Sequence, residues 1–170
     1  MGIIGSSGSG KTTLLADLIP ILTARGFSVS TIKHTHHGFD LDNPGKDSYR
    51  HREAGAREVL LTSSKRWALL HECGEEKEAD VSELIKRMSL VDILLIEGFK
   101  KHPFPKIEVY RPGVGKPILA HNDSSILALA TDEPNDHSVI ELGLPVLDLE
   151  DTTNIADFII ANIIANPVFS

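Results

Sequence analysis

Short apolar runs alternate with segments of helical periodicity along most of the chain. The apolar residues of 11–25 repeat at a spacing of about 3.6 residues, so they predict a helix, which we expect to continue with a kink past Pro20. The run 92–97 is apolar between two carboxylates, a pattern typical of a strand buried on both faces of a parallel sheet. Further strands are predicted at 3–4, 27–33, 106–111, 126–130 and 146–147, and further helices at 47–56, 81–88 and 155–163.

Strands that alternate with helices in this way predict an α/β fold, with a mostly parallel sheet and helices on both faces. Residues 58–62 and 67–71 are shorter strand candidates, and we interpret them as a hairpin. Polar and apolar residues alternate over 106–111, so we expect one face of that strand to be exposed to solvent. Asp47 is the expected N-terminal cap of its helix, and Asp80 is expected near the start of the helix at 81–88.

Composition and charge narrow the class of protein. With 170 residues, no internal repeat and no linker, the chain is expected to form a single nucleotide-binding domain over residues 1–170. The net charge of −7 argues against a nucleic-acid partner, but all 17 lysines and arginines lie within residues 1–116, so anion-binding chemistry is expected there. The lone Cys73 excludes a disulfide within the chain. The sequence shows no long apolar span and no secretory leader, so we expect a cytoplasmic protein with no membrane partner.

Residues 5–12 carry a phosphate-binding pattern and predict a P-loop NTPase-like fold. They read Gly-Ser-Ser-Gly-Ser-Gly-Lys-Thr and fit G-x-x-x-x-G-K-[ST] between a strand and a helix. Such a loop turns its backbone N–H groups inward around an anion, and the helix adds its positive end. Lys11 is placed to reach the β- and γ-phosphates during catalysis, and the Thr12 hydroxyl is placed to ligate Mg²⁺. The expected phosphate-binding residues are Gly5, Ser6, Ser7, Gly8, Ser9, Gly10, Lys11, Thr12 and Thr13.

Glu97 is a second candidate for metal binding and catalysis. It ends the apolar run 92–97, and in a parallel sheet the carboxyl ends of the strands face the ligand crevice. A carboxylate there can hold Mg²⁺, directly or through water, or polarise the attacking water. The alternative is an acid at a strand end that simply faces solvent.

Six further blocks of sequence accompany the phosphate-binding pattern, and those within 33–56 are together more specific than it is. The blocks are Lys-His-Thr-His-His at 33–37, Phe-Asp-Leu-Asp at 39–42, Pro-Gly-Lys-Asp-Ser at 44–48, Arg-Glu-Ala-Gly-Ala at 52–56, Arg-Trp-Ala-Leu at 66–69 and Glu-Gly-Phe-Lys at 97–100. Together with residues 5–12 they resemble the MobB family, molybdopterin-guanine dinucleotide biosynthesis proteins B, from residue 1 to about residue 132. The resemblance implies a GTP-binding homodimer with weak GTPase activity. It also implies a partner, the molybdenum cofactor guanylyltransferase, which converts molybdopterin cofactor into its guanine dinucleotide form.

The polar segment after the second predicted strand is interpreted as a switch-like loop near the phosphates. Its carboxylates can engage Mg²⁺ or its waters, and its cationic side chains can meet a second anion, such as the phosphate of a bound molybdopterin. Its histidines can contact phosphates or, as the alternative, ligate a transition metal. The residues assigned to this loop are His34, His36, Asp40, Asp42, Lys46, Asp47 and Arg52.

Asp132 is the candidate for recognition of the base. Guanine presents N1–H and N2–H₂ side by side, and a carboxylate can accept both hydrogen bonds. Asp132 follows a predicted strand late in the chain. No N-K-x-D motif is present, so the prediction that the protein binds GTP rather than ATP depends mainly on the resemblance. The alternative is that Asp132 caps a helix before Glu133-Pro134.

The sequence thus supports an Mg²⁺-dependent GTP-binding protein of molybdenum cofactor maturation, with two alternatives. Slow hydrolysis is expected because no internal arginine finger is identified, and the nearby arginines are Arg50 and Arg52. A P-loop small-molecule kinase could use the basic segment 46–52 to bind its acceptor, although the last third of the chain lacks arginines for a lid. A GTP-driven metal-delivery chaperone could use the histidines.

Overall fold

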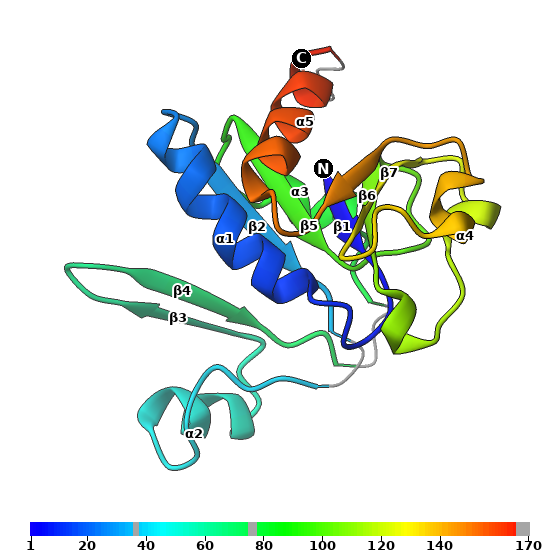
Figure 1. The fold of residues 1–170 in the computed structure, drawn as a ribbon. Coiled ribbons are helices and arrows are strands. Elements are labelled where there is room, and N and C mark those ends of the chain that lie inside the picture. Colours follow the sequence, from blue (N-terminus) through cyan, green and yellow to red (C-terminus); the bar gives the residue numbers. More distant parts are fainter. Residues whose placement is uncertain (36–37, 75–77, 166–170) are drawn as a thin grey trace. The chain divides into compact units, whose positions relative to one another are not determined.

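The computed structural model describes residues 1–35, 38–74 and 78–165, and these residues form two compact units (Figure 1). The first unit comprises residues 1–34 and the described residues from 90 onward, and the second comprises the described part of 35–89. The single domain expected over the whole chain stays a prediction.

The first unit is built on a six-stranded sheet in which every strand pairing is parallel. The order β2-β5-β1-β6-β7-β8 places β1 (Gly2–Ile4) between β5 (Ile93–Glu97) and β6 (Lys106–Tyr110). Since all strands run in one direction, their carboxyl ends share one edge, where the loop after β1 lies beside the ends of β5 and β6. The predicted α/β class is therefore confirmed. The remaining strands are β2 (Val29–Lys33), β7 (Ile126–Thr131) and β8 (Val146–Asp148).

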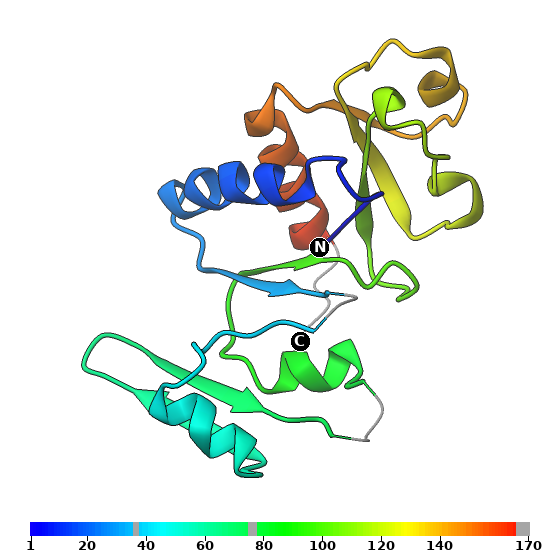
Figure 2. The ribbon, with the colours of Figure 1, turned by 90° about the horizontal axis from the view of Figure 1, so that it is seen from below.

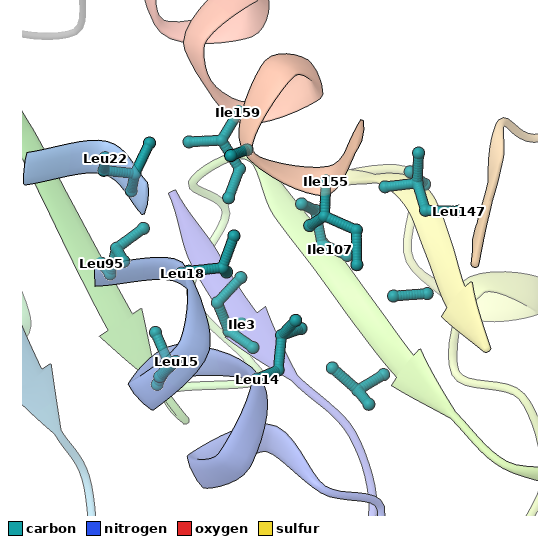
Figure 3. Packing of buried hydrophobic residues seen from close by; sticks show 14 of the residues in the cluster. Ile3, Leu14, Leu15, Leu18, Leu22, Leu95, Ile107, Leu147, Ile155 and Ile159 are labelled. Carbon is teal, nitrogen blue, oxygen red and sulfur yellow. The ribbon is translucent and has the colours of Figure 1, made fainter. Parts of the chain in front are cut away.

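Two long helices cover one face of this sheet. In Figures 2 and 3, α1 (Lys11–Ala24) and α5 (Thr152–Ala165) pack side by side over the strands. Leu18 of α1, Ile155 of α5 and Ile3 of β1 belong to one cluster and are fully buried. The predicted helix at 11–25 is confirmed, and α1 continues through Pro20 as expected.

A smaller cluster covers the opposite face. Neighbouring residues of a strand point to opposite faces, so Ile4 faces away from the cluster that holds Ile3. Ile4 packs in a group with Leu129 of β7 and Val139 of α4 (His137–Ile140). Helices therefore lie on both faces, as predicted. Two short 3₁₀ turns complete the unit, η1 (Pro112–Val114) and η2 (Ala120–Asn122).

The prediction that one face of β6 is exposed to solvent is wrong. Lys106 and Glu108, the polar residues of the alternation, are each only 1% exposed. The Lys106 ammonium donates to Asp123 Oδ2 at 2.6 Å and to two backbone carbonyls, and the Glu108 carboxylate accepts from the N–H groups of Leu119 and Ala120. Buried charges persist when their hydrogen-bonding capacity is met within the protein. Alternating polarity on β6 therefore reflects internal pairing and not a solvent-facing surface.

The two aspartates predicted at helix starts have different outcomes. Asp80 lies at the start of α3 (Val81–Lys86) as predicted, and its carboxylate caps the helix by accepting a hydrogen bond from the N–H of Ser82. Asp47 is instead the first residue of α2 (Asp47–Glu53), whose cap position is held by Lys46 without a side-chain bond. In the first turn, Asp47 can still favour the helix through its charge near the positive end of the helix dipole.

The second unit contains α2, α3 and a two-stranded antiparallel sheet. β3 (Glu58–Thr62) and β4 (Trp67–His71) pair directly, which confirms the predicted hairpin. Leu60 and Trp67 are 61% and 68% exposed, so much of the hairpin's apolar surface faces solvent within this chain. Across both units, none of the described helices has the length and apolar character needed to cross a lipid bilayer.

Candidate phosphate-binding site

The loop of residues 5–10 joins β1 to α1 and depends on its glycines. A side chain at Gly5 would place its Cβ 2.3 Å from the carbonyl oxygen of Val109 on β6, so only glycine fits this close approach. Gly10, the residue before α1, has a φ of 95° in the left-handed region. No acidic side chain lies in the first turn of α1 and none caps the helix. The backbone at this position is thus arranged to receive an anion.

Lys11 folds back onto the loop that precedes it. Its Nζ donates to the carbonyl oxygen of Ser6 at 2.7 Å. Burial lowers the pKa of Lys11 below its usual value, and the neighbouring charges of Lys100 and Lys33 lower it further, while Glu97 opposes them. Lys11 is therefore held over the loop within a cluster of cations, where an anion would be stabilised.

Thr12 and Glu97 lie together at the start of α1, while their predicted role as magnesium ligands stays a prediction. The Thr12 hydroxyl donates to Glu97 Oε1 at 2.9 Å, although the residues are 85 positions apart in the sequence. Glu97 is 9% exposed, so its carboxylate is not an acid that simply faces solvent. The two side chains are positioned together because β5 and β1 are paired strands.

Lys33 is a functional candidate that the sequence analysis did not assign. Its Nζ lies 3.2 Å from Thr12 Oγ1 and 3.2 Å from Glu97 Oε2. Lys33 and Glu97 are register partners at the ends of β2 and β5, a neighbour relation that the sequence alone did not reveal. The ammonium thus occupies a position between the two oxygen-bearing side chains where a cation is favoured.

The segment after β5 brings Lys100 to the same edge of the sheet. Gly98 has a φ of 100°, and a Cβ there would lie 2.8 Å from the Cβ of His34, so this turn requires glycine. Phe99 adopts a positive φ of 48° and stacks on the His34 ring with centroids 4.4 Å apart. Lys106 donates to the carbonyl of Lys100 and so fixes the far side of the turn.

Arg111 is a second functional candidate that local sequence patterns do not indicate, because its contacts join segments that are distant in the sequence. It directly follows β6, and its Nε donates to the carbonyl oxygen of Ser9 at 3.0 Å. Its Nη1 lies 2.7 Å from Asp132 Oδ2. Asp132 therefore lies at the end of β7 in an ion pair, and the neighbouring helix α4 takes Asp136 as its cap.

The switch-like residues of the second unit form a group of their own. Arg52 donates to Asp42 and Asp40 at 2.8 Å and 2.9 Å, and its other nitrogen lies 3.2 Å from Glu72. The Asp42 and Glu72 hydrogen bonds raise the pKa of Arg52. The guanidinium is thus surrounded by carboxylates. Its contact with a second anion, such as the phosphate of a ligand, stays a prediction. The roles of the other residues assigned to this loop also stay predictions.

Metal binding by the histidines stays an untested alternative, because His36 and His37 lie outside the described residues. His34 belongs to the first unit and stacks on Phe99. Over the described ranges, no group of three or more histidine, cysteine or acidic side chains is arranged to hold a metal ion.

The chain is similar to several known proteins. The family model "MobB: Molybdopterin guanine dinucleotide synthesis protein B" matches residues 1–132. The molybdopterin-guanine dinucleotide biosynthesis adapter protein of Escherichia coli is 45% identical over 157 residues, which cover 91% of this chain and 87% of that protein. The adapter protein of the same name from Haemophilus influenzae is 44% identical over 159 residues, covering 94% and 86%. A crystal structure of molybdopterin-guanine biosynthesis protein B aligns with a TM-score of 0.73 and 29% identity, covering 95% of this chain and 97% of that one.

Proposed function

The chain belongs to the MobB family, and from this premise we propose that it binds GTP with Mg²⁺ through residues 5–13. We further propose that it assists a guanylyltransferase in forming the guanine dinucleotide of molybdopterin, with molybdopterin as a candidate ligand. One observation carries the nucleotide proposal: Lys11, Thr12 and Glu97 converge on the glycine loop at the carboxyl edge of the sheet. Backbone N–H groups, an ammonium and two oxygen ligands are what a Mg²⁺-triphosphate requires.

The residues present fit a magnesium ion. Hydroxyl and carboxylate oxygens are its preferred protein ligands, and the Thr12 and Glu97 oxygens lie 2.9 Å apart. A cation, the Lys33 ammonium, already lies 3.2 Å from each side chain. Bound Mg²⁺ would neutralise charge on the β- and γ-phosphates, with Thr12 as ligand and Glu97 holding the ion directly or through water.

In the proposed mechanism, Lys11 exchanges the Ser6 carbonyl for oxygens of the β- and γ-phosphates. Its ammonium then stabilises the charge that develops during hydrolysis, while Glu97 orients or polarises the attacking water. Asp132 is proposed to accept hydrogen bonds from guanine N1–H and N2–H₂, because it follows β7 at the same edge of the sheet. Hydrolysis by the isolated chain is expected to be slow, with a partner completing the site.

We also propose that the protein is a homodimer. The exposed apolar side chains of the hairpin support this, because an isolated two-stranded sheet is marginally stable in water and gains from burial against another surface. Leu60, Leu69 and Trp67 share one face of the hairpin, since Leu60 pairs with Leu69 and Thr62 with Trp67.

Equilibrium binding of GTP and ATP, with and without Mg²⁺, tests the nucleotide proposal. The wild-type chain should bind GTP more tightly with Mg²⁺, and Lys11→Ala should weaken binding by roughly 100-fold, because a charge-assisted contact to phosphate is lost. Lys116→Ala, an exposed lysine of the same unit, is the matched control and should bind as the wild type does. GTP hydrolysis is then measured with and without the guanylyltransferase. Absence of GTP binding by the wild type would overturn the proposal.

A further inference from the structure

We propose that Arg111 is a positioning residue of the phosphate-binding loop, and that Asp132 influences phosphate binding through Arg111. The inference rests on the proposed function, because it takes residues 5–13 as the phosphate site. It adds a role for Arg111 and a second role for Asp132 beside recognition of the base.

The Arg111 guanidinium joins three segments at the carboxyl edge of the sheet. Its own backbone follows β6, its Nε donates to Ser9 of the loop after β1, and its Nη1 pairs with Asp132 after β7. A Cβ built on Gly10 would lie 3.4 Å from both Nε and Nη2, so the guanidinium lies against the Gly10 backbone. One side chain therefore contacts the loop at two consecutive residues.

The bond to Ser9 sets the orientation of a peptide group in the loop. A trans peptide is planar, so its C=O and N–H point in opposite directions. When Arg111 holds the Ser9 carbonyl on one side, the N–H of Gly10 points to the other. Glycine at position 10, with its φ of 95°, offers little resistance to rotation of this peptide. Arg111 is thus the contact that keeps the peptide in one orientation.

Asp132 in turn orients Arg111. The Arg111 and Asp132 side chains are 38% and 36% exposed, so this ion pair contributes little to folding stability by itself. A charge-assisted hydrogen bond of 2.7 Å nevertheless restricts the direction of a long side chain. Loss of Asp132 should therefore appear in ligand binding more than in the free energy of unfolding.

Inorganic tripolyphosphate separates this role from recognition of the base, because it carries phosphates without a base. Asp132→Asn removes a negative charge near the site, and simple electrostatics predicts tighter binding of the anion. Positioning through Arg111 predicts the opposite sign, a weakening of roughly fivefold to tenfold. Arg111→Gln should weaken tripolyphosphate binding by at least as much, and adding Asp132→Asn to it should cause little further loss.

The Arg25–Asp157 pair supplies a matched control. It is an exposed ion pair of 2.6 Å in the same unit, formed by the end of α1 and by α5. Asp157→Asn changes the net charge by the same amount as Asp132→Asn, yet it should leave the tripolyphosphate affinity unchanged. The Arg111→Lys variant keeps the positive charge, but lysine cannot contact Ser9 and Asp132 at once as the planar guanidinium does. Its tripolyphosphate affinity should therefore lie between those of Arg111→Gln and the wild type.

Tripolyphosphate dissociation constants for these variants, measured by calorimetry in Mg²⁺, decide the inference, with thermal unfolding recorded for each. Weaker binding by Asp132→Asn with an unchanged melting temperature supports it. If Asp132→Asn binds tripolyphosphate as tightly as the wild type, or more tightly, the inference is overturned while the proposed function stands. If the wild type binds neither GTP nor tripolyphosphate, the proposed function fails and the inference fails with it.

Discussion

At the scale of single residues, the charge around Lys11 governs the candidate site. Lys33 and Lys100 both lower the pKa of Lys11, and burial lowers it more. Like charges held together cost free energy in the unliganded protein, and a bound polyphosphate would relieve that cost. Lys11 and Thr12 could be assigned from the pattern of residues 5–12, whereas Lys33 could not, because its contacts come from strand pairing between distant segments.

Phosphate binding should depend on pH through Lys11. Its lowered pKa means that the ammonium loses its proton at a lower pH than an ordinary lysine does. A bound phosphate favours the charged form and raises this pKa, so binding takes up protons at alkaline pH. Affinity for tripolyphosphate should fall there by up to about tenfold per pH unit. Calorimetry in two buffers of different ionisation enthalpy measures the uptake, which Lys11→Arg should abolish. A wild type without proton uptake would contradict this assignment.

Lys33 should compete with magnesium for Glu97 and Thr12. In the Lys33→Gln variant the competing ammonium is absent, so less Mg²⁺ should be needed to promote GTP binding. We expect the ratio of GTP affinity with Mg²⁺ to that without it to rise about threefold to tenfold. Magnesium titrations of GTP binding measure this ratio, and Lys116→Gln, an exposed lysine of the same unit, is the control. An unchanged or smaller ratio in Lys33→Gln would show that the ammonium does not compete.

At the scale of elements, β6 shows where hydrophobic patterning misleads. Its alternation resembles that of a half-exposed strand, but Lys106 and Glu108 are both buried and hydrogen-bonded to partners in other segments, such as Asp123 and Leu119. Burial raises the pKa of Glu108, and the backbone N–H groups that it accepts from oppose this shift. By contrast, β5 was predicted correctly as a buried strand, because a wholly apolar run needs no distant partner to be buried.

Lys106→Met should destabilise the first unit. The ammonium donates to Asp123 and to the carbonyls of Lys100 and His102, and the methionine leaves all three without this donor. We expect the free energy of unfolding to fall by about 2–4 kcal/mol, as measured by urea denaturation. Lys101→Met, at an exposed neighbouring position, should change it by less than about 0.5 kcal/mol. Equal stability of the two variants would mean that the buried bonds contribute nothing net.

At the scale of the whole molecule, local patterns predicted most elements and the glycine-rich loop of residues 5–10, while the relations between segments came only from the structure. The order β2-β5-β1 and the Arg111–Asp132 pair join segments whose contacts no local pattern encodes. Arg52 is a similar case, since three carboxylates from the second unit surround it. From the sequence alone, charged residues in a loop suggest binding of an anion or a metal ion. In the structure, such residues often form ion pairs with one another instead.

The exposed hairpin leads to a prediction about assembly. Leu60 and Leu69 lie directly opposite each other and are 61% and 44% exposed, so together they present apolar surface that a second copy of the chain could cover. Replacing both with serine should raise the dimer dissociation constant at least about tenfold, because each lost side chain removes apolar area from the contact. Sedimentation equilibrium measures the constant. Leu90→Ser is the control, since Leu90 is 95% exposed but lies outside the hairpin. If the double variant associates as tightly as the wild type, the dimer contact must lie on another surface, because loss of two facing leucines cannot leave an apolar interface at this position unchanged.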